Sequence, residues 1–232
     1  MRRSFHLLGT VLAVAGVLTL LWALLVWQWQ DPFTALYTKW EQHRLASQYE
    51  KRTRSFDTTI SGVTVAAERE SIAHEAKRYR TSSKRGQVIG RLLVPRMGVN
   101  MLLVNGTDHD TLKKGPGRDG RTFMPGENRL VYIAGHRTTY LAPFSHIDRL
   151  RSGDRVMIEV PYGTFTYAVT RHRIVAATDL SVLRSPKHEL VELQACHPRF
   201  FASHRYLAYA QLLRVEPRGA KPYDLTAQAS GK

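Results

Sequence analysis

The chain has 232 residues, of which 43% are hydrophobic and 23% are charged, a composition that is typical of a globular protein and excludes an intrinsically disordered one. The formal net charge is +15, yet no block of about five or six like charges indicates a nucleic-acid-binding arm. A diffuse positive charge suits an anionic membrane or wall polymer as well as it suits nucleic acid, so the charge alone does not select a partner.

The N-terminal segment predicts a membrane anchor. Arg2 and Arg3 are followed by an apolar run from Leu7 to Trp29 that contains no acidic or basic residue. A helix needs about 20 apolar residues to cross a bilayer, and this run supplies that length. A secretory signal peptide has a shorter apolar core. We therefore expect residues 1–30 to be an uncleaved membrane anchor rather than a signal peptide or a buried core helix.

The flanks of this segment predict its orientation. Trp22, Trp27 and Trp29 cluster toward its far end, where an aromatic belt belongs. Arg2 and Arg3 lie on the short N-terminal side, and positive residues favour the cytoplasmic side of a membrane. The sequence thus predicts a single-pass protein of the cell membrane, with its N-terminus in the cytoplasm and the rest of the chain outside.

The next segment is polar and helix-prone. Asp31 is suited to an N-cap and Pro32 to the first helical position, and two helical stretches follow at 33–56 and 65–80. We expect residues 31–85 to form a helical stalk or linker that holds the following domain away from the membrane. A helical cap packed on that domain is the alternative.

The remainder of the chain, residues 86–217, predicts an all-β domain. Short β-rich runs are separated by Gly, Pro, Asn and Asp, and two short helical turns are expected near 108–115 and 142–150. This spacing predicts a closed or nearly closed β-barrel or sandwich. A Pro- and Ala-containing tail, 218–232, is expected to be flexible. The predicted strands are 88–97, 100–105, 128–135, 154–162, 164–177, 188–196 and 205–215.

The stretch "ELQACHPRF" holds the only cysteine, Cys196, which therefore has no partner for an internal disulfide. A free cysteine is commonly a small buried hydrophobe, whereas a nucleophilic cysteine needs a base or ion-pair partner and an oxyanion stabiliser. His197 is adjacent, but consecutive side chains on a strand point to opposite faces. His197 is thus predicted to be a bystander, and the partner must come from elsewhere in the chain.

Two other residues are placed to complete such a site. His136 follows Gly135 at the end of an apolar strand, so it is expected to face the end of a neighbouring strand. Arg205 opens the strand after Cys196, and a hairpin-like return would bring its guanidinium beside the thiol, where its donors suit an oxyanion. The simpler interpretations are a loop histidine bonded to backbone and a solvated arginine.

Other motifs do not support a different chemistry. "GPGRDG" at 115–120 has the glycine spacing of a dinucleotide-binding loop, but turn and strand follow it where that motif requires a helix. His197 and His204 flank Cys196 without the spacing of zinc ligands. We expect no cofactor, no metal ion and no nucleic-acid partner.

Taken together, "VYIAGHRT" (131–138), "FSHIDRLRSGD" (144–154), "LQACHP" (193–198) and the following Arg205 resemble the bacterial sortases, and the likeness runs in order through 86–217. "GHRTTYLAPF" most resembles the class E sortases of high-GC Gram-positive bacteria. The resemblance implies a mainly β protein, a closed eight-stranded sortase-type barrel with short helices, preceded by a transmembrane helix and a helical stalk.

The resemblance also implies roles for individual residues. Cys196 is the expected nucleophile, His136 its ion-pair partner and proton donor, and Arg205 the group that holds the substrate or stabilises the oxyanion. Tyr140 and Ala195 are expected to contact the substrate. The family usually has threonine immediately before the cysteine, and Ala195 stands there in this chain.

The implied function is that of a membrane-anchored cysteine transpeptidase. Such an enzyme cleaves a Leu-Ala-x-Thr-Gly or Leu-Pro-x-Thr-Gly type sorting signal between Thr and Gly and transfers the protein to an amine. The expected partners are surface proteins with C-terminal sorting signals, a peptidoglycan precursor or pilin amine, and the membrane. The alternatives are an L,D-transpeptidase-like wall enzyme and a non-catalytic anchored protein that binds wall polymers.

Overall fold

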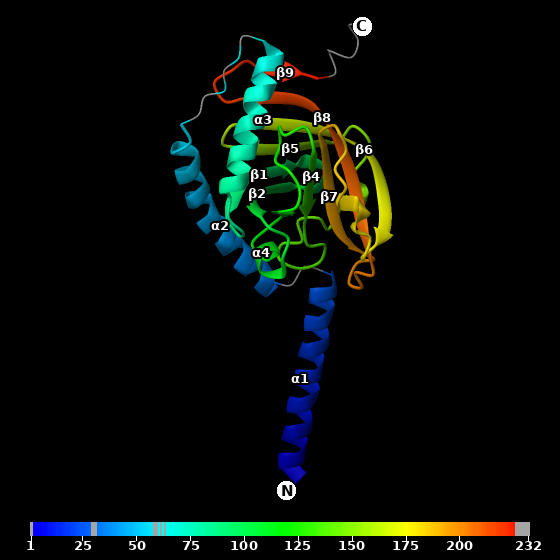
Figure 1. Ribbon diagram of the computed structural model, residues 1–232. Helices are drawn as coiled ribbons and strands as arrows, with labels where there is room; N and C mark the ends of the chain where they lie inside the picture. The colour runs from blue at the N-terminus through cyan, green and yellow to red at the C-terminus, as the bar shows by residue number, and fades with distance from the viewer. Residues whose placement is uncertain (1, 29–31, 58–59, 61, 63, 226–232) are drawn as a thin grey trace.

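The computed structural model describes residues 2–28, 32–57, 60, 62 and 64–225. Eight strands close into a barrel in the order β6-β5-β1-β2-β3-β4-β7-β8, and pairing of β6 with β8 completes the ring (Figure 1). The short β9 pairs with β8 beside this ring. The strands are β1 (Val88–Val94), β2 (Val99–Asn105), β3 (Gly117–Arg118), β4 (Leu130–Ala134), β5 (Arg155–Val160), β6 (Gly163–Ala176), β7 (Leu190–His197), β8 (His204–Pro217) and β9 (Tyr223–Asp224). The predicted closed barrel is confirmed.

All seven predicted strands are present, but the first of them is shorter than predicted and β3 was not predicted. The predicted strand 88–97 ends at Val94, and a 3-10 helix (Pro95–Met97) follows because proline has no N–H for the ladder. The sequence gives no signal for β3, which lies within "GPGRDG" and pairs in parallel with β2 and antiparallel with β4. A strand of two residues shows no periodicity. The predicted helical turns correspond to α4 (His109–Leu112) and the 3-10 helix η2 (Ile147–Arg149).

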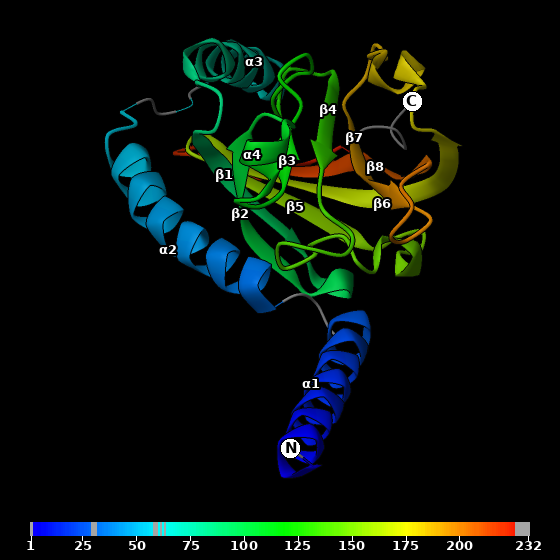
Figure 2. The same cartoon turned by 90° about the horizontal axis from the view of Figure 1, so that it is seen from below.

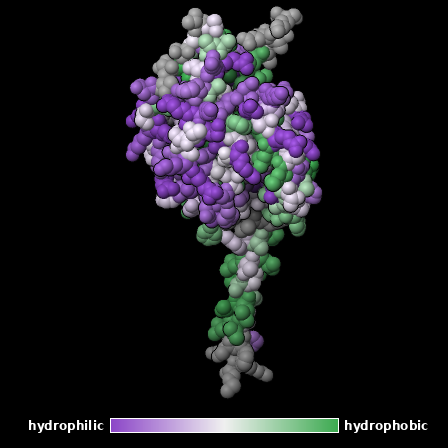
Figure 3. Space-filling model, in the orientation of Figure 1, coloured by the Kyte–Doolittle hydropathy of each residue, from purple (hydrophilic) through white to green (hydrophobic). Residues whose placement is uncertain are grey.

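The N-terminal helix α1 (Arg2–Gln28) extends away from the barrel (Figure 1). Its stretch His6–Leu24 is long and apolar enough to cross a membrane, and 0% of it is buried. Figure 3 shows hydrophobic residues along this helix below a mostly hydrophilic barrel face. The side chain of Trp27, as well as Trp29 and the expected N-cap Asp31, lies outside the described part of the chain.

Helix α2 (Pro32–Arg54) lies against the outer face of β1 and β2 (Figure 2). The side-chain amide of Gln42 donates to the carbonyl of Leu102 (3.1 Å) and accepts from its amide (2.7 Å). Leu45 is fully buried in a cluster with side chains from both strands. The helix is thus tied to the barrel by both polar and apolar contacts.

Helix α3 (Val65–Ser82) packs on the main barrel core through Ile72, Ala76 and Tyr79. The Tyr79 hydroxyl also donates to the carbonyl of Ile89 (3.0 Å). Both helices therefore contact the barrel, which is the arrangement of a helical cap, the alternative to a free-standing stalk.

The first part of the C-terminal tail, 218–232, forms a short strand. Tyr223–Asp224 form β9, in which Val215 faces Tyr223, and the amide of Leu225 donates to the carbonyl of Leu213 (2.8 Å). The segment has no β periodicity of its own, and it becomes a strand because the long neighbouring strand β8 offers it backbone hydrogen-bond partners. Residues 226–232 lie outside the described part of the chain.

Candidate active site

The parallel pair β4–β7 places His136 and Cys196 together. Its last registered pair is Ala134 with Gln194, and the amide of Gly135 donates to the carbonyl of Gln194 (3.0 Å). His136 and Cys196 each lie two positions beyond that pair. Because strand side chains alternate with a period of two, both fall on the same, outer face of the barrel.

The antiparallel pair β7–β8 adds Arg205. Cys196 and Arg205 are directly opposite in the register, so their side chains share a face. Nη1 of Arg205 donates to the carbonyls of Ala202 (2.7 Å) and His204 (3.0 Å), which anchors the guanidinium to the start of its own strand. The hairpin-like return predicted from the sequence is the observed one.

One cavity of about 250 Å³ is lined by His136, Cys196 and Arg205 together. Its other walls come from β4, β7, the connection between β2 and β3, the start of the β3–β4 loop and the β6–β7 loop with its 3-10 helix η3 (Leu180–Leu183). Three residues separated by up to 69 positions in the chain are thereby brought to a single concave site.

The environment of His136 favours its neutral form. Burial lowers the pKa of this imidazole below its usual value, and the positive charge that His109 can carry lowers it further. The Nε2 atom is buried and makes no hydrogen bond with the described residues. An unpaired buried nitrogen is costly and needs an explanation.

Tyr140 contacts the site indirectly. Its ring lies 5.0 Å from the His136 ring, centroid to centroid, but it does not line the cavity. Residues 140–142 all have left-handed backbone, with φ of 53°, 61° and 38°, which is unfavourable for side chains with a Cβ. The Tyr140 amide donates to Oγ1 of Thr34 (3.1 Å), and its ring meets Tyr37 of α2 edge-on. The loop beside His136 is therefore held by α2.

Ala195 points the other way, contrary to the expected substrate contact. It is fully buried in the barrel core together with Val191 and Leu193, which share its parity on β7. Alternation along the strand places Ala195 on the inner face and Cys196 on the outer one. The missing threonine hydroxyl at this position is thus a change inside the barrel, and Ala195 does not line the cavity.

Arg137 is a residue of the site that we did not predict from the sequence. Its side chain is 4% exposed. Nη1 donates to the carbonyl of Cys196 (3.2 Å), and Nη2 forms an ion pair with Asp148 (3.3 Å). The guanidinium also lies 5.7 Å from the centroid of the Tyr206 ring. Arg137 thus fixes the backbone of the residue that carries the thiol.

The Arg137 side chain also contacts the ring of His197. Nη1 of Arg137 lies 3.0 Å from Nδ1 of His197. A guanidinium only donates, so Nδ1 of His197 accepts, and alternation along β7 places His197 on the face opposite to Cys196. The alternation that predicts His197 to be a bystander also places Arg137 on the face opposite to His136, but it gives no signal that Arg137 reaches the Cys196 carbonyl across 59 positions of the chain.

Glu192 is a buried carboxyl on the same strand and face as Cys196. The residue is 1% exposed, and its Oε1 has no hydrogen-bond partner among the residues that the structure describes. Burial raises its pKa from 4.5 to about 8, against the opposing effects of Arg171 and Arg173. The folded protein therefore keeps Glu192 protonated at pH values at which the unfolded chain has lost that proton.

We expect the substitution Glu192→Gln to stabilise the protein at alkaline pH. As pH rises from 4.5 toward about 8, the unfolded chain loses the Glu192 proton while the folded protein keeps it. The free energy of unfolding of the wild type therefore falls over this range. A tenfold change in a protonation equilibrium corresponds to about 1.4 kcal/mol, so the variant should gain a few kcal/mol at about pH 8.5 and much less at about pH 5. Thermal unfolding in detergent at the two pH values measures this difference. The exposed Glu50→Gln is the control, and an equal effect of both variants would contradict the prediction.

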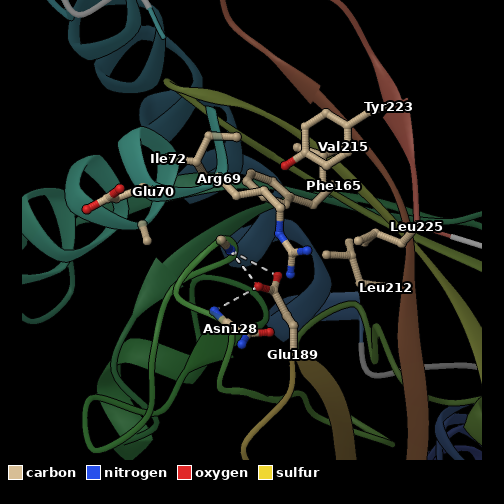
Figure 4. A pocket seen from close by; sticks show the side chains of 12 residues that line it. Arg69, Glu70, Ile72, Asn128, Phe165, Glu189, Leu212, Val215, Tyr223 and Leu225 are labelled. Atoms are coloured by element: carbon tan, nitrogen blue, oxygen red, sulfur yellow. Dashed lines mark hydrogen bonds between the residues drawn. The ribbon is translucent and has the colours of Figure 1, made fainter. Parts of the chain in front are cut away.

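A second cavity, of about 210 Å³, lies between α3 and the barrel (Figure 4). Its buried carboxylate, Glu189, accepts hydrogen bonds from the amides of Gly126 and Asn128 and from the Tyr167 hydroxyl (2.6 Å). These donors satisfy the carboxylate, and neither a cysteine nor a histidine lines this cavity. The nucleophilic chemistry therefore belongs to the first cavity.

A closed β-barrel with Cys, His and Arg at adjoining strand ends indicates the class of enzymes that react through a cysteine thiol. A sequence profile described as "Sortase domain" matches residues 92–213, more than half of the chain. The chain belongs to the sortase family.

Individual relatives agree with this assignment. The chain is 34% identical over 131 residues to Sortase D of Bacillus subtilis, covering 54% of this chain and 64% of that protein. It is 27% identical over 168 residues to Sortase SrtE1 of Streptomyces coelicolor, covering 65% and 48%. The alignments thus span about half to two thirds of these relatives, and class D and class E sortases are both among them.

Solved structures show the same fold. A sortase D5 transpeptidase of Clostridium perfringens superimposes with a TM-score of 0.60 at 23% identity, covering 75% of this chain and 98% of that one. Sortase E of Streptomyces avermitilis gives a TM-score of 0.50 at 28% identity, with coverage of 64% and 96%. The barrel and the order of its strands are therefore those of sortases.

Proposed function

We propose that this protein is a membrane-anchored cysteine transpeptidase that cleaves a sorting signal between Thr and Gly and transfers the acyl part to an amine. The observation that carries the proposal is the convergence of His136, Cys196 and Arg205 on one cavity. A nucleophile, a proton carrier and a cationic hydrogen-bond donor are the three groups that acyl transfer requires. The membership of the sortase family supports the same reaction class.

The first half of the proposed reaction forms a thioester. The Cys196 thiolate attacks the carbonyl carbon of the Thr–Gly peptide bond, and the carbonyl oxygen becomes an oxyanion. Arg205 stabilises that charge or holds the substrate beside the thiol. The C–N bond then breaks, and the His136 imidazolium gives its proton to the departing glycine amine.

The second half transfers the acyl group. An incoming amine attacks the thioester, neutral His136 removes the surplus proton, and the thiolate leaves Cys196. The buried Nε2 of His136, which lacks a partner, supports its role as the group that carries the proton in both halves. Because burial lowers its pKa, only a fraction of His136 holds the proton at neutral pH, yet that form is the stronger acid.

The proposed setting is the outer face of the cell membrane of a Gram-positive bacterium. Helix α1 would anchor the chain with its N-terminus in the cytoplasm, the cap of residues 31–85 would link it to the barrel of 86–217, and a tail of 218–232 would follow. The acyl donors would be surface proteins with a Leu-Ala-x-Thr-Gly or Leu-Pro-x-Thr-Gly type signal. The acceptor would be the amine of a peptidoglycan precursor or a pilin. Confinement of enzyme and donor to one surface raises their effective concentration.

The direct test is capture of the thioester. The full chain in detergent is incubated with a fluorescent peptide of each signal type, without an acceptor amine, and is then quenched in acid. We expect a fluorescent adduct whose mass and fragmentation place the acyl group on Cys196, and its release by hydroxylamine. Cys196→Ala is the matched control. Absence of an adduct with both peptides, together with an unreactive thiol, would favour a non-catalytic wall-binding protein instead.

A further inference from the structure

The first turns of α2 carry an exposed apolar face. Phe33, Leu36 and Trp40 are 72%, 70% and 59% exposed. Spacings of three and four residues put them on one side of the helix. The opposite side, with Thr38 and Glu41, is buried against the barrel. The apolar face is therefore largely exposed in the described part of the chain.

This face lies close to the end of the candidate membrane helix. Helix α1 ends at Gln28 and α2 begins at Pro32, a connection that spans at most about 14 Å. The rings of Trp22 and Phe33 lie 5.7 Å apart, which joins the apolar surface of α1 to that of α2. If α1 crosses a bilayer, the start of α2 is necessarily at its surface.

The β7–β8 loop presents a second apolar feature at the same end of the barrel. Phe200 and Phe201 are 61% and 81% exposed. Figure 1 shows this loop and the start of α2 both at the end from which α1 leaves. Phe200 has a left-handed backbone with φ of 75°, an unfavourable conformation for a residue with a side chain, and such strain is concentrated at functional sites.

Basic residues adjoin both apolar features. Exposed Lys39 precedes Trp40, and exposed Arg199 precedes Phe200, in a chain with a net charge of +15. Aromatic side chains next to Lys or Arg suit the boundary between lipid headgroups and acyl chains, with anionic headgroups as the complement of the positive charge.

We propose that this end of the barrel rests on the bilayer, with Phe33, Leu36, Trp40, Phe200 and Phe201 inserted among anionic lipid headgroups. This inference rests on the proposed membrane anchoring by α1. The β7–β8 loop is bracketed by Cys196 and Arg205, so lipid contact at its tip holds the site at the membrane surface. A sorting signal that is followed by its own apolar span would meet the thiol there without leaving the membrane.

The test uses the full chain in vesicles with and without anionic lipid. In a Cys196→Ala background, single cysteines at Leu36→Cys and Phe201→Cys carry an environment-sensitive fluorophore. Leu18→Cys in α1 reports the anchor, and exposed Glu70→Cys on α3 is the control remote from this end. Nitroxide lipids labelled near the headgroup or near the chain terminus serve as quenchers, and circular dichroism verifies the fold of each variant.

The expected result is quenching at Leu36→Cys and Phe201→Cys by the shallow nitroxide, stronger with anionic lipid, and none at Glu70→Cys. Quenching of Leu18→Cys alone would overturn the docking while leaving the anchor intact. Absence of quenching at Leu18→Cys would refute the anchor itself. Protection of Phe201→Cys from aqueous iodide without lipid quenching would mean that a second copy or another protein covers this face, and would also overturn the proposal.

Discussion

Replacing His136 by alanine is expected to lower kcat/KM for transpeptidation by about 10³-fold, the range in which a general acid contributes to catalysis. The loss follows from the absence of a proton donor for the departing amine. It should appear mainly in kcat, because the imidazole acts on the reacting bond. Peptide cleavage and amine transfer, followed by chromatography, measure both parameters.

The pH profile distinguishes this role from a structural one. Burial holds the pKa of His136 below its usual value, so the fraction of His136 that carries a proton falls as pH rises. The wild type should therefore lose transpeptidation activity as pH rises through the pKa of His136. The residual activity of His136→Ala should lack this alkaline loss. The exposed His188→Ala is the matched control, and full transpeptidation by His136→Ala would disprove the assignment.

Replacing Arg137 by methionine is expected to lower kcat/KM by about 10²-fold, since a displacement of roughly 1 Å at the nucleophile has that effect. Methionine keeps much of the length of the side chain but removes the hydrogen bond to the Cys196 carbonyl and the ion pair with Asp148. Loss of the hydrogen-bond donor to the Cys196 carbonyl should also lower the free energy of unfolding by about 1–3 kcal/mol. Arg137 is thus a positioning residue that acts through the strand end carrying the thiol.

A readout besides stability separates positioning from folding. We expect Arg137→Met to change the rate of Cys196 alkylation, measured well below the unfolding temperature. Arg137→Lys should recover part of the stability but little of the activity, because one ammonium does not reproduce a planar fork that contacts three groups. Exposed Arg155→Met is the control. Alkylation and kcat/KM unchanged from the wild type would show that Arg137 is only part of the core.

The local patterns of the sequence were sufficient for seven of the strands and for placing His136, Cys196 and Arg205 at strand ends. Each predicted strand comes from a period of two over several residues, and His136, Cys196 and Arg205 stand at the ends of such strands, where alternation predicts the face of each side chain. The length and apolar character of α1 are likewise properties of a continuous segment. The sequence alone thus determined the candidate membrane span, the predicted strands and the placement of the three residues at strand ends, while the closed barrel was what the resemblance to the sortases implied.

Only the tertiary structure decided the features that depend on distant pairing. β3 has two residues and exists because β2 and β4 offer it partners on both sides. The polar segment before the barrel becomes a cap because its buried residues, such as Leu45 and Ile72, find apolar partners on the barrel. Arg137 reaches the Cys196 carbonyl across 59 positions of the chain. The register between strands and the contacts between distant residues depend on how the whole barrel is assembled. The periodicity of a single segment does not contain that information.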